Sequence, residues 1–360
     1  MALEQVAQQH YRRSSLTTRQ VVAAVLELWS ATGPSGFRDE LTRAAGLVAA
    51  GQLSQAVQAA DYLLALAAEQ GMSPAEAQVV PRALAGAGAD GRPLVDVLSY
   101  PINRVWTMLD SGADFATANT SGTASLTRIV ANEVAQAGTN GTHIGMTGQS
   151  QMVGYVRMLS RPSCGRCAIL AGKWFRWNQG FARHPGCDCV HVPAAESQGV
   201  ADLRTDPDAY FKSLSTADQD KYFGAANAQA IRDGSNMGQV VNASTVTRRG
   251  KAQSGLYEFD TGDGRKLQAT TQGTTVRQGR AGRRMAVADG QLDGRIPTAF
   301  ERANRPRLTP KSIYELAGSD RAKAQALLYD NGYLDSRPID RSVSGLMADA
   351  GRPNAALGRR

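Results

Sequence analysis

Residues 163–193 have the sequence SCGRCAILAGKWFRWNQGFARHPGCDCVHVP, and all four cysteines of the 360-residue chain lie within it. Two of the four histidines lie there as well. Four cysteines placed by chance would not all fall within 26 positions, so we expect this stretch to have a chemical role that organises the middle of the chain. Its thiols and imidazoles are Cys164, Cys167, His184, Cys187, Cys189 and His191.

The spacing of the thiols predicts a structural zinc site. Two residues separate Cys164 from Cys167, so both thiolates can face one ion from a tight turn, and Cys187 with Cys189 would complete a tetrahedral set. His184, three residues before Cys187, is an alternative fourth ligand or a hydrogen-bonding partner of a ligand. Zinc is therefore the expected cofactor, and a bound ion worth on the order of 10 kcal/mol would hold this loop-rich segment together.

Two other interpretations of the thiols stay open. The cysteines could be reduced thiols in an ordinary core, or Cys164 and Cys167 could form a redox pair. A redox pair should open a helix after a strand and expose its reactive thiol, whereas here the pair follows Arg161-Pro162-Ser163. The chain start lacks a signal peptide and no apolar run is long enough to cross a membrane, so we expect a reducing cytoplasm and no membrane partner.

The sequence shows no catalytic constellation. A zinc deaminase needs His-x-Glu before Pro-Cys-x-x-Cys, but His184 is followed by Pro185 and Gly186, and the Cys-x-x-Cys comes first. The chain has no HExxH, P-loop, GxSxG or glycine-rich dinucleotide motif. We therefore expect no enzyme, although a zinc or cysteine hydrolase, with a cysteine paired to His184 or His191, remains an alternative.

Outward from the cysteines, the N-terminal part of the chain predicts packed helices. Apolar residues from Val21 to Trp29 recur at spacings of three and four, and TGPSG at 32–36 closes this helix. Further helices are expected over 37–51 and 53–71. We assign residues 1–93 to an N-terminal helical region whose apolar faces must be covered by packing.

Residues 94–235 form the second predicted region, which contains the zinc site at 164–191. Two packing helices are expected before the cysteines, over 94–112 and 115–138, with Trp106 and the methionines in the core. After the cysteines, Ser215 or Thr216 should cap a short helix that turns at Gly224 into a second helix.

Residues 307–360 predict a C-terminal helical hairpin followed by a tail. The stretch RLTPKSIYELAGSDRAKAQALLYDNGYL has the order found after the cysteines: a leucine, a Ser or Thr cap, a short helix, a glycine, a second helix and a closing glycine. This order is typical of a recurrent helical hairpin as well as of a true repeat.

Residues 236–306 predict an extended basic arm or linker with one β-hairpin turning at Asp263-Gly264. Between residues 236 and 311 there are 14 Lys or Arg and 6 Asp or Glu, an excess that equals the net charge of +8 of the whole chain. A local basic excess favours a polyanionic partner or an acidic protein surface. The candidate nucleic-acid-binding residues are Arg248, Arg249, Lys251, Arg277, Arg280, Arg283 and Arg284.

The cysteine signature resembles a known family. SRPSCGRCAILAGKWF followed by HPGCDCVHVP is similar to the signature of the phage Mu protein F-like family, the minor capsid or head morphogenesis proteins of tailed phages. The segment LSTADQDKYFGAANAQAIRDG resembles the part that follows the signature, and residues 305–334 resemble the C-terminal tail of such proteins in phages of actinobacteria. The resemblance covers about 95–235 well. In the places of the signature stand Cys164, Cys167, His184, Pro185, Cys187 and Cys189.

The resemblance implies a low-copy virion protein in the head interior or near the portal, and in the host cytoplasm during assembly. Its partners would be the portal, the major capsid protein, or both, with packaged DNA on the basic arm, and its role would be capsid assembly or DNA packaging and delivery. A nucleic-acid-binding zinc module is an alternative, in which Trp174, Phe175, Trp177 and Phe181 would contact bases. We thus expect a mainly α fold with a small α+β zinc-bound module, an extended basic arm and a C-terminal helical hairpin.

Overall fold

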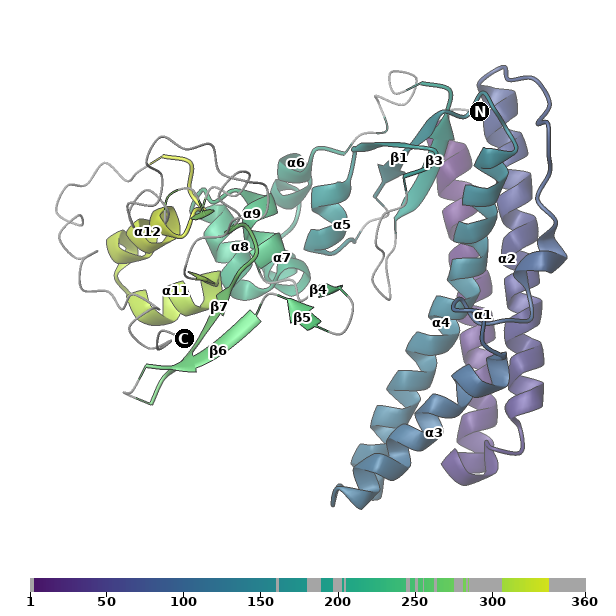
Figure 1. Ribbon diagram of the computed structural model, residues 1–360, viewed down its shortest axis with the longest axis horizontal. Helices are drawn as coiled ribbons and strands as arrows, with labels where there is room; N and C mark the ends of the chain where they lie inside the picture. Colours follow the sequence, from purple (N-terminus) through teal and green to yellow (C-terminus); the bar gives the residue numbers. More distant parts are fainter. Residues whose placement is uncertain are drawn as a thin grey trace. The chain divides into compact units, whose positions relative to one another are not determined.

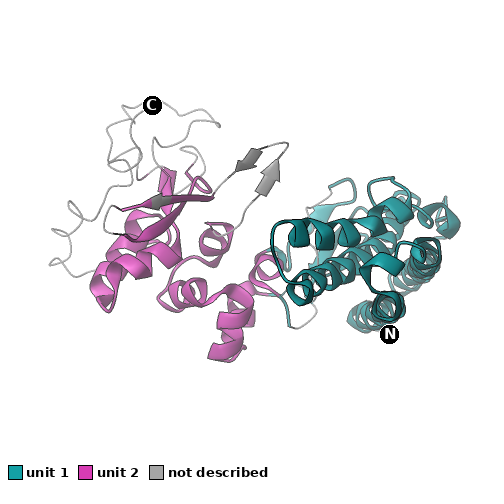
Figure 2. Ribbon diagram, turned by 90° about the horizontal axis from the view of Figure 1, so that it is seen from below, with its two compact units in different colours: residues 1–163, 170–205 teal, residues 164–169, 206–360 magenta. Residues whose placement is uncertain are grey.

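A computed structural model describes the chain as two compact units (Figures 1 and 2). Unit 1 comprises residues 1–163 and 170–205, and unit 2 comprises residues 164–169 and 206–360. Among the described residues no helix has the length and apolarity needed to cross a membrane. The described residues are 3–159, 162–179, 189–196, 203, 205–243, 247–249, 252–254, 256–261, 264–274, 281–282, 284 and 306–336.

Long helices build most of unit 1, and they run alongside one another in Figure 1. The helices α1, α2 and α4 pack against one another, and α3 packs on α2 and α4. The prediction of a mainly helical chain with small sheets is confirmed. The helical segments of unit 1 are α1 (Leu3–Gly36), α2 (Leu41–Glu69), the 3₁₀ turn η1 (Pro81–Leu84), α3 (Leu94–Asp110) and α4 (Phe115–Thr147).

The helices of unit 1 are longer than the sequence suggested. The two helices expected over 37–51 and 53–71 are one helix, α2, which passes through Gly51. A β-carbon at Gly51 would lie 2.6 Å from Val21 Cγ2 and 3.2 Å from Val134 Cγ2. This glycine therefore permits close contact between helices and does not end one. The first helix does end near the expected TGPSG motif, where Gly33 has φ 66°.

The larger part of the unit 1 core lies among the four helices. Trp29 is 2% exposed, its Nε1 donates to Asn119 Oδ1 at 3.1 Å, and its ring packs edge-on against Phe37. Trp106, by contrast, is 41% exposed, so its assignment to the core was wrong. Its helix, α3, buries the other face: Leu94, Val97, Leu98, Pro101, Ile102 and Val105.

A three-stranded antiparallel sheet completes unit 1. Its strands are β1 (Gly154–Met158), β2 (Trp174–Arg176) and β3 (Val190–Ala194), in the order β2-β1-β3. Every residue of β1 and β3 is buried. The register sets Arg157 opposite His191, and paired residues of an antiparallel sheet share a face. Apolar residues of β1 and β3 form a second core cluster with residues of α1, α2 and α4.

The division of the chain differs from the predicted boundaries at 93 and 235. Helix α4 lies beyond residue 93, yet it packs on α1 and α2, so the first two predicted regions share one body up to residue 205. Within this range only residues 164–169 belong to the other unit, unit 2. A boundary drawn from sequence falls where composition changes, whereas a compact unit is defined by packing between segments far apart in the chain.

Short helices dominate unit 2, and most of them start at a residue that caps the helix. Ser215 accepts a hydrogen bond from Asp218 N at the start of α7, and Thr309 accepts one from Ser312 N at the start of α11, so both predicted caps are confirmed. The helices are α5 (Gly165–Leu170), α6 (Pro207–Lys212), α7 (Thr216–Phe223), α8 (Ala225–Arg232), α9 (Met237–Ala243), α11 (Pro310–Ala317) and α12 (Arg321–Asp330).

The two helical hairpins of unit 2 share a glycine of positive φ between their helices as well as their sequence order. Gly224 between α7 and α8 has φ 87°, and Gly318 between α11 and α12 has φ 58°, a region that favours glycine. Each second helix ends in the same pair of backbone bonds: Ser235 N donates to Ala230 O at 2.9 Å, and Tyr333 N donates to Leu328 O at 2.8 Å. The recurrence inferred from sequence is therefore a recurrence of structure.

The described part of the predicted arm contains short strands. The expected hairpin is present, because β6 (Leu256–Asp260) pairs antiparallel with β7 (Lys266–Thr270). Of the expected turn pair, Gly264 has φ 83° and Asp263 lies outside the described residues. Strand β8 (Arg307–Leu308) joins its other edge, and β4 (Thr247–Arg249) pairs separately with β5 (Ala252–Ser254).

Arg307 in β8 is fully buried and belongs to the fold of unit 2. Its guanidinium donates to the carbonyl oxygens of Asn331 and Gln239, both at 3.2 Å, and lies 4.5 Å from the centre of the Tyr333 ring. Burial lowers the pKa of Arg307 below its usual range. The positive charge of Arg307, one of those counted over residues 236–311, is therefore bound within unit 2 and is not available to a partner.

Candidate functional site

The first cysteine pair lies at the start of α5. Cys164 directly precedes the helix, where its carbonyl accepts from Ala168 N at 3.0 Å, and Cys167 lies in the first turn. Residues three apart on a helix lie on one side of it, so the two thiols can chelate one ion. Cys164 is half-buried and Cys167 is 1% exposed.

This position also meets one condition of the redox interpretation. The pair opens a helix, α5, and the preceding element is the strand β1, contrary to the setting inferred from sequence. The condition of an exposed thiol is met only in part, by the half-buried Cys164. Zinc and redox chemistry therefore both remain compatible with the geometry of the first pair.

The second half of the predicted zinc site is described only at Cys189. This residue is 6% exposed and directly precedes β3, in unit 1, whereas Cys164 and Cys167 belong to unit 2. His184 and Cys187 lie outside the described residues. Within the described ranges, no three His, Cys, Asp or Glu side chains lie close enough to hold a metal ion. The residues present fit half of a zinc site, and the complete ligand set stays a prediction.

Few of the candidate nucleic-acid-binding residues lie within the described part of the chain. Arg248 and Arg249 belong to β4, whose backbone alone is described, and Lys251, Arg277, Arg280 and Arg283 lie outside the described residues. Arg284 is described. Its guanidinium stacks 3.9 Å from the centre of the Tyr329 ring and donates to the carbonyl oxygens of Tyr329 and Asp335. Arg284 therefore binds the end of α12.

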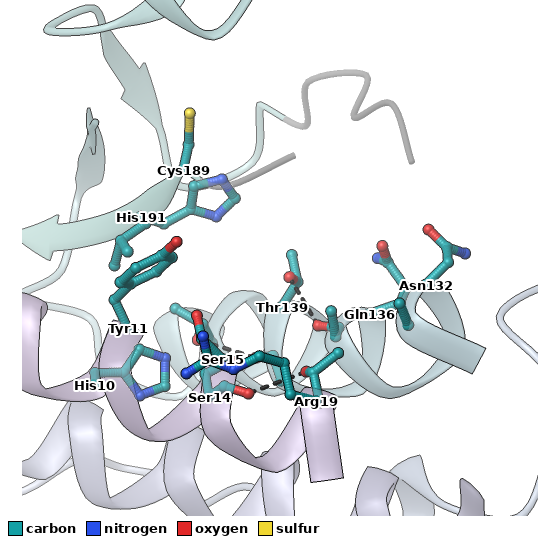
Figure 3. Close-up of a pocket in the computed structure, with 16 residues that line it drawn as sticks. His10, Tyr11, Ser14, Ser15, Arg19, Asn132, Gln136, Thr139, Cys189 and His191 are labelled. Atoms are coloured by element: carbon teal, nitrogen blue, oxygen red, sulfur yellow. Dashed lines mark hydrogen bonds between the residues drawn. The ribbon is translucent and has the colours of Figure 1, made fainter. Parts of the chain in front are cut away.

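A cavity of about 320 Å³ lies within unit 1, between α1, α4 and the start of β3 (Figure 3). Side chains of α1 spaced four residues apart form one wall, side chains of α4 form the opposite wall, and β3 closes one end. The lining is rich in hydroxyl, amide and imidazole groups, and it contains no Asp or Glu among the described residues. Its polar members include His10, Ser14, Ser15, Arg19, Asn132, Gln136, Thr139, Cys189 and His191.

Three of the four histidines of the chain gather at this end of unit 1. His143 Nε2 lies 3.0 Å from His191 Nδ1, so one imidazole donates and the other accepts, according to their tautomers. Both rings contact Tyr155, whose hydroxyl donates to Gln179 O at 2.6 Å. Burial raises the pKa of Tyr155 to about 12, while the nearby charge of Arg157 acts in the opposite direction.

His10 joins the same cluster from α1. Its ring stacks on Tyr62 of α2, with the ring centres 4.1 Å apart, and Tyr62 Oη donates to His191 O at 2.9 Å. Burial, followed by the positive charge of Arg13, lowers the pKa of His10 to about 4. His10 is therefore neutral at pH 7, and Tyr62 stays protonated because burial raises its pKa.

The sequence did not point to this cluster, because His10 and His143 lie far apart along the chain. Of the histidines in the cysteine stretch, only His191, named above as a possible hydrolase partner of a cysteine, lines the cavity. The sequence carries no local signal for this cluster beyond the small number of histidines, four in 360 residues. Cys189 and His191 do line one cavity, as a hydrolase would require, but the described lining offers no carboxylate to complete a triad.

The comparisons assign the chain to a class of proteins and then to a family. A family of phage proteins matches residues 1–217, which include the helices of unit 1 and the whole cysteine stretch. The family is described as VG15 protein, and because the match covers more than half of the chain, the chain belongs to it. No curated protein matches the chain, and no solved structure matches it either.

Proposed function

We propose that this phage protein is a minor capsid protein that acts in head assembly or in DNA packaging and delivery. The observation that carries the proposal is the VG15 family match over residues 1–217, and this range contains the cysteine signature that resembles Mu protein F-like head proteins. The family match supports a phage protein. The Mu F-like resemblance supplies the finer assignment to a few copies in the virion, in the head interior or near the portal.

The surface of unit 1 supports a protein that assembles with others. Large apolar side chains remain exposed on it, among them Val80 at 66%, Leu64 at 60% and Phe115 at 57%. We propose the portal, the major capsid protein, or both, as the partners that cover these side chains in the head.

A phage carrying a nonsense codon early in this gene tests the role in the head. We expect cells infected with it to accumulate empty or malformed heads in electron micrographs, and a plasmid copy of the gene to restore infectious particles. The chain should also be detected in purified virions by mass spectrometry. Normal, infectious heads without the chain would contradict the proposal.

We further propose that zinc stabilises the cysteine segment, held by Cys164, Cys167, Cys187 and Cys189, with His184 as the alternative fourth ligand. Zinc would supply no chemistry beyond structural cross-linking. Protein purified under reducing conditions should contain about one zinc per chain, and Cys167→Ala should abolish it. Zinc-free protein with a reversible disulfide between Cys164 and Cys167 would instead support the redox alternative.

DNA contact by the basic arm is proposed for the residues that the fold leaves available. Arg248 and Arg249 lie on the β4–β5 ribbon. For Arg284 we propose a structural role instead, because its guanidinium donates to carbonyl oxygens of unit 2, as that of Arg307 does. Gel-shift titration should show binding to random duplex DNA that weakens steeply with salt and that is lost without residues 244–306. Equal binding by the shortened chain would exclude the arm.

A further inference from the structure

Polar side chains on both long walls of the unit 1 cavity are not used by the fold. Ser15 and Arg19 of α1 and Asn132 of α4 line the cavity, and within the described part of the chain their side chains make no hydrogen bond or ion pair. Ser15 and Asn132 are half-buried, and Arg19 lies at the exposed rim. In Figure 3 these side chains surround the open space between the two helices.

Several neighbouring side chains in the same lining are hydrogen-bonded within the fold. The hydroxyls of Thr18 and Thr142 donate to the carbonyl oxygens four residues earlier, at 3.0 and 3.1 Å, and Gln136 Nε2 donates to Asn140 Oδ1 at 2.8 Å. Half-buried donors normally find a partner in the fold or in water. Ser15, Arg19 and Asn132 thus line one cavity from two helices, and their side chains are available to a ligand.

The charge around the cavity favours an anion. The described lining has Arg19 and no carboxylate, and α1 carries Arg12 and Arg13 with no Asp or Glu between residues 5 and 26. A guanidinium beside a hydroxyl and an amide is a common arrangement for binding an oxyanion, because its hydrogen bonds are charge-assisted.

We propose that this cavity binds a small phosphorylated molecule whose phosphate group accepts hydrogen bonds from Ser15, Arg19 and Asn132. The volume of about 320 Å³ lies at the lower end of small-molecule sites. A duplex cannot enter a space enclosed by α1, α4 and β3, so the ligand is a free phosphate or a small molecule that carries one. This proposal goes beyond the role in head assembly and does not depend on it.

Calorimetric titration of the full chain with inorganic phosphate and with AMP tests the proposal and separates the two sources. We expect saturable binding of at least one of the two probes. Arg19→Gln should weaken it roughly ten- to hundredfold, because it removes a hydrogen bond to a charged group. Arg38→Gln, which removes an exposed arginine outside the cavity, should bind as the wild type does.

Circular dichroism should show that both variants keep the helical content of the wild type, which is expected because both arginines are exposed. Two results would overturn the proposal: neither probe binds the wild type at millimolar concentration, or Arg19→Gln and Arg38→Gln bind equally well. A short duplex that binds in place of AMP and is equally sensitive to Arg19→Gln would also overturn it, in favour of a nucleic-acid surface.

Discussion

Unit 1 and unit 2 are both mainly helical, but their helices are of different kinds. The helices α1, α2 and α4 of unit 1 have 34, 29 and 33 residues, whereas those of unit 2 have between 6 and 10. A long helix can gain most of its stability from one continuous apolar face, and a short helix depends more on its ends. The two units therefore distribute their stability differently.

The capping residues and close contacts follow this difference. Four helices of unit 2 begin at a side chain that accepts a backbone hydrogen bond: Asp206, Ser215, Thr309 and Asp320. In unit 1, α4 begins at such a cap, Asp114, whereas α2 and α3 begin without one. Unit 1 instead depends on close approach of helices, as at Gly122, where a β-carbon would lie 2.4 Å from Val105 Cγ2. Packing mutations should damage unit 1 most, and mutations of capping residues should damage unit 2.

The largest expected effect is that of Trp29→Ala. Removing this side chain leaves a cavity among α1, α3 and α4 and should lower the free energy of unfolding of unit 1 by about 3–5 kcal/mol. Trp106→Ala, the matched control, removes a tryptophan that is 41% exposed and should cost much less. Urea denaturation followed by circular dichroism measures both changes. Equal losses for the two variants would show that the core of unit 1 is not centred on Trp29.

The second prediction concerns the effect of acid on unit 1. The pKa of His10 is about 4 in the folded chain, compared with an ordinary value of 6.5. Between these pH values the unfolded chain binds a proton that folded His10 excludes, so stability falls as the pH drops from 6.5 to 4. One unit of pKa corresponds to 1.36 kcal/mol, so the loss is up to about 3 kcal/mol.

His10→Gln isolates this contribution, because glutamine does not titrate. The difference in unfolding free energy between wild type and His10→Gln should change across pH 6.5 to 4 and stay constant above pH 7. The carboxylates of Asp90 and Asp114, whose pKa values are lowered by hydrogen bonds to Arg92 and Thr117, lose their contributions at lower pH. A constant difference over the whole range would mean that His10 is not shielded from water in the folded chain.

The smallest expected effects are those of the capping residues in unit 2. Ser215→Ala and Thr309→Ala should each lower the stability of unit 2 by about 1 kcal/mol, because each leaves a backbone N–H without its acceptor. Ser319→Ala removes an exposed hydroxyl that caps no helix and should change stability by less than about 0.5 kcal/mol. The readout is the urea-denaturation transition that Trp29→Ala leaves unchanged. Losses that appear in the transition shifted by Trp29→Ala would contradict the division into two units.

The features that could be predicted from the sequence are those that local chemistry determines. The caps Ser215 and Thr309 and the β6–β7 hairpin were found because capping and hairpin signals involve only neighbouring residues. The length of α2 was missed because Gly51 resembles a helix end in sequence, and only contact with Val21 and Val134 reveals its role. The helical face that buries Trp29 was recognised, but periodicity alone could not place Trp106 at the surface.

The candidate site was predicted less well than the fold. Clustering along the chain revealed Cys164 and Cys167, whereas His10 and His143 meet His191 only through tertiary packing, which has no local signal. The unused donors Ser15, Arg19 and Asn132 could not be recognised from sequence for the same reason. Whether such a side chain has a hydrogen-bond partner depends on residues that are distant in the chain.

The segment 164–169 belongs to unit 2 although unit 1 continues on both sides of it, and this connectivity has a consequence during synthesis. Helix α5 packs where Gly165 approaches Phe223 and Val241, and Val241 is added 76 residues after Gly165. At about 5–20 residues per second, the ribosome needs roughly 4–15 seconds to add that stretch. During this interval α5 lacks its contacts with Phe223 and Val241. Cys167, which is 1% exposed in the folded chain, is therefore open to metal ions and oxidants until α5 packs.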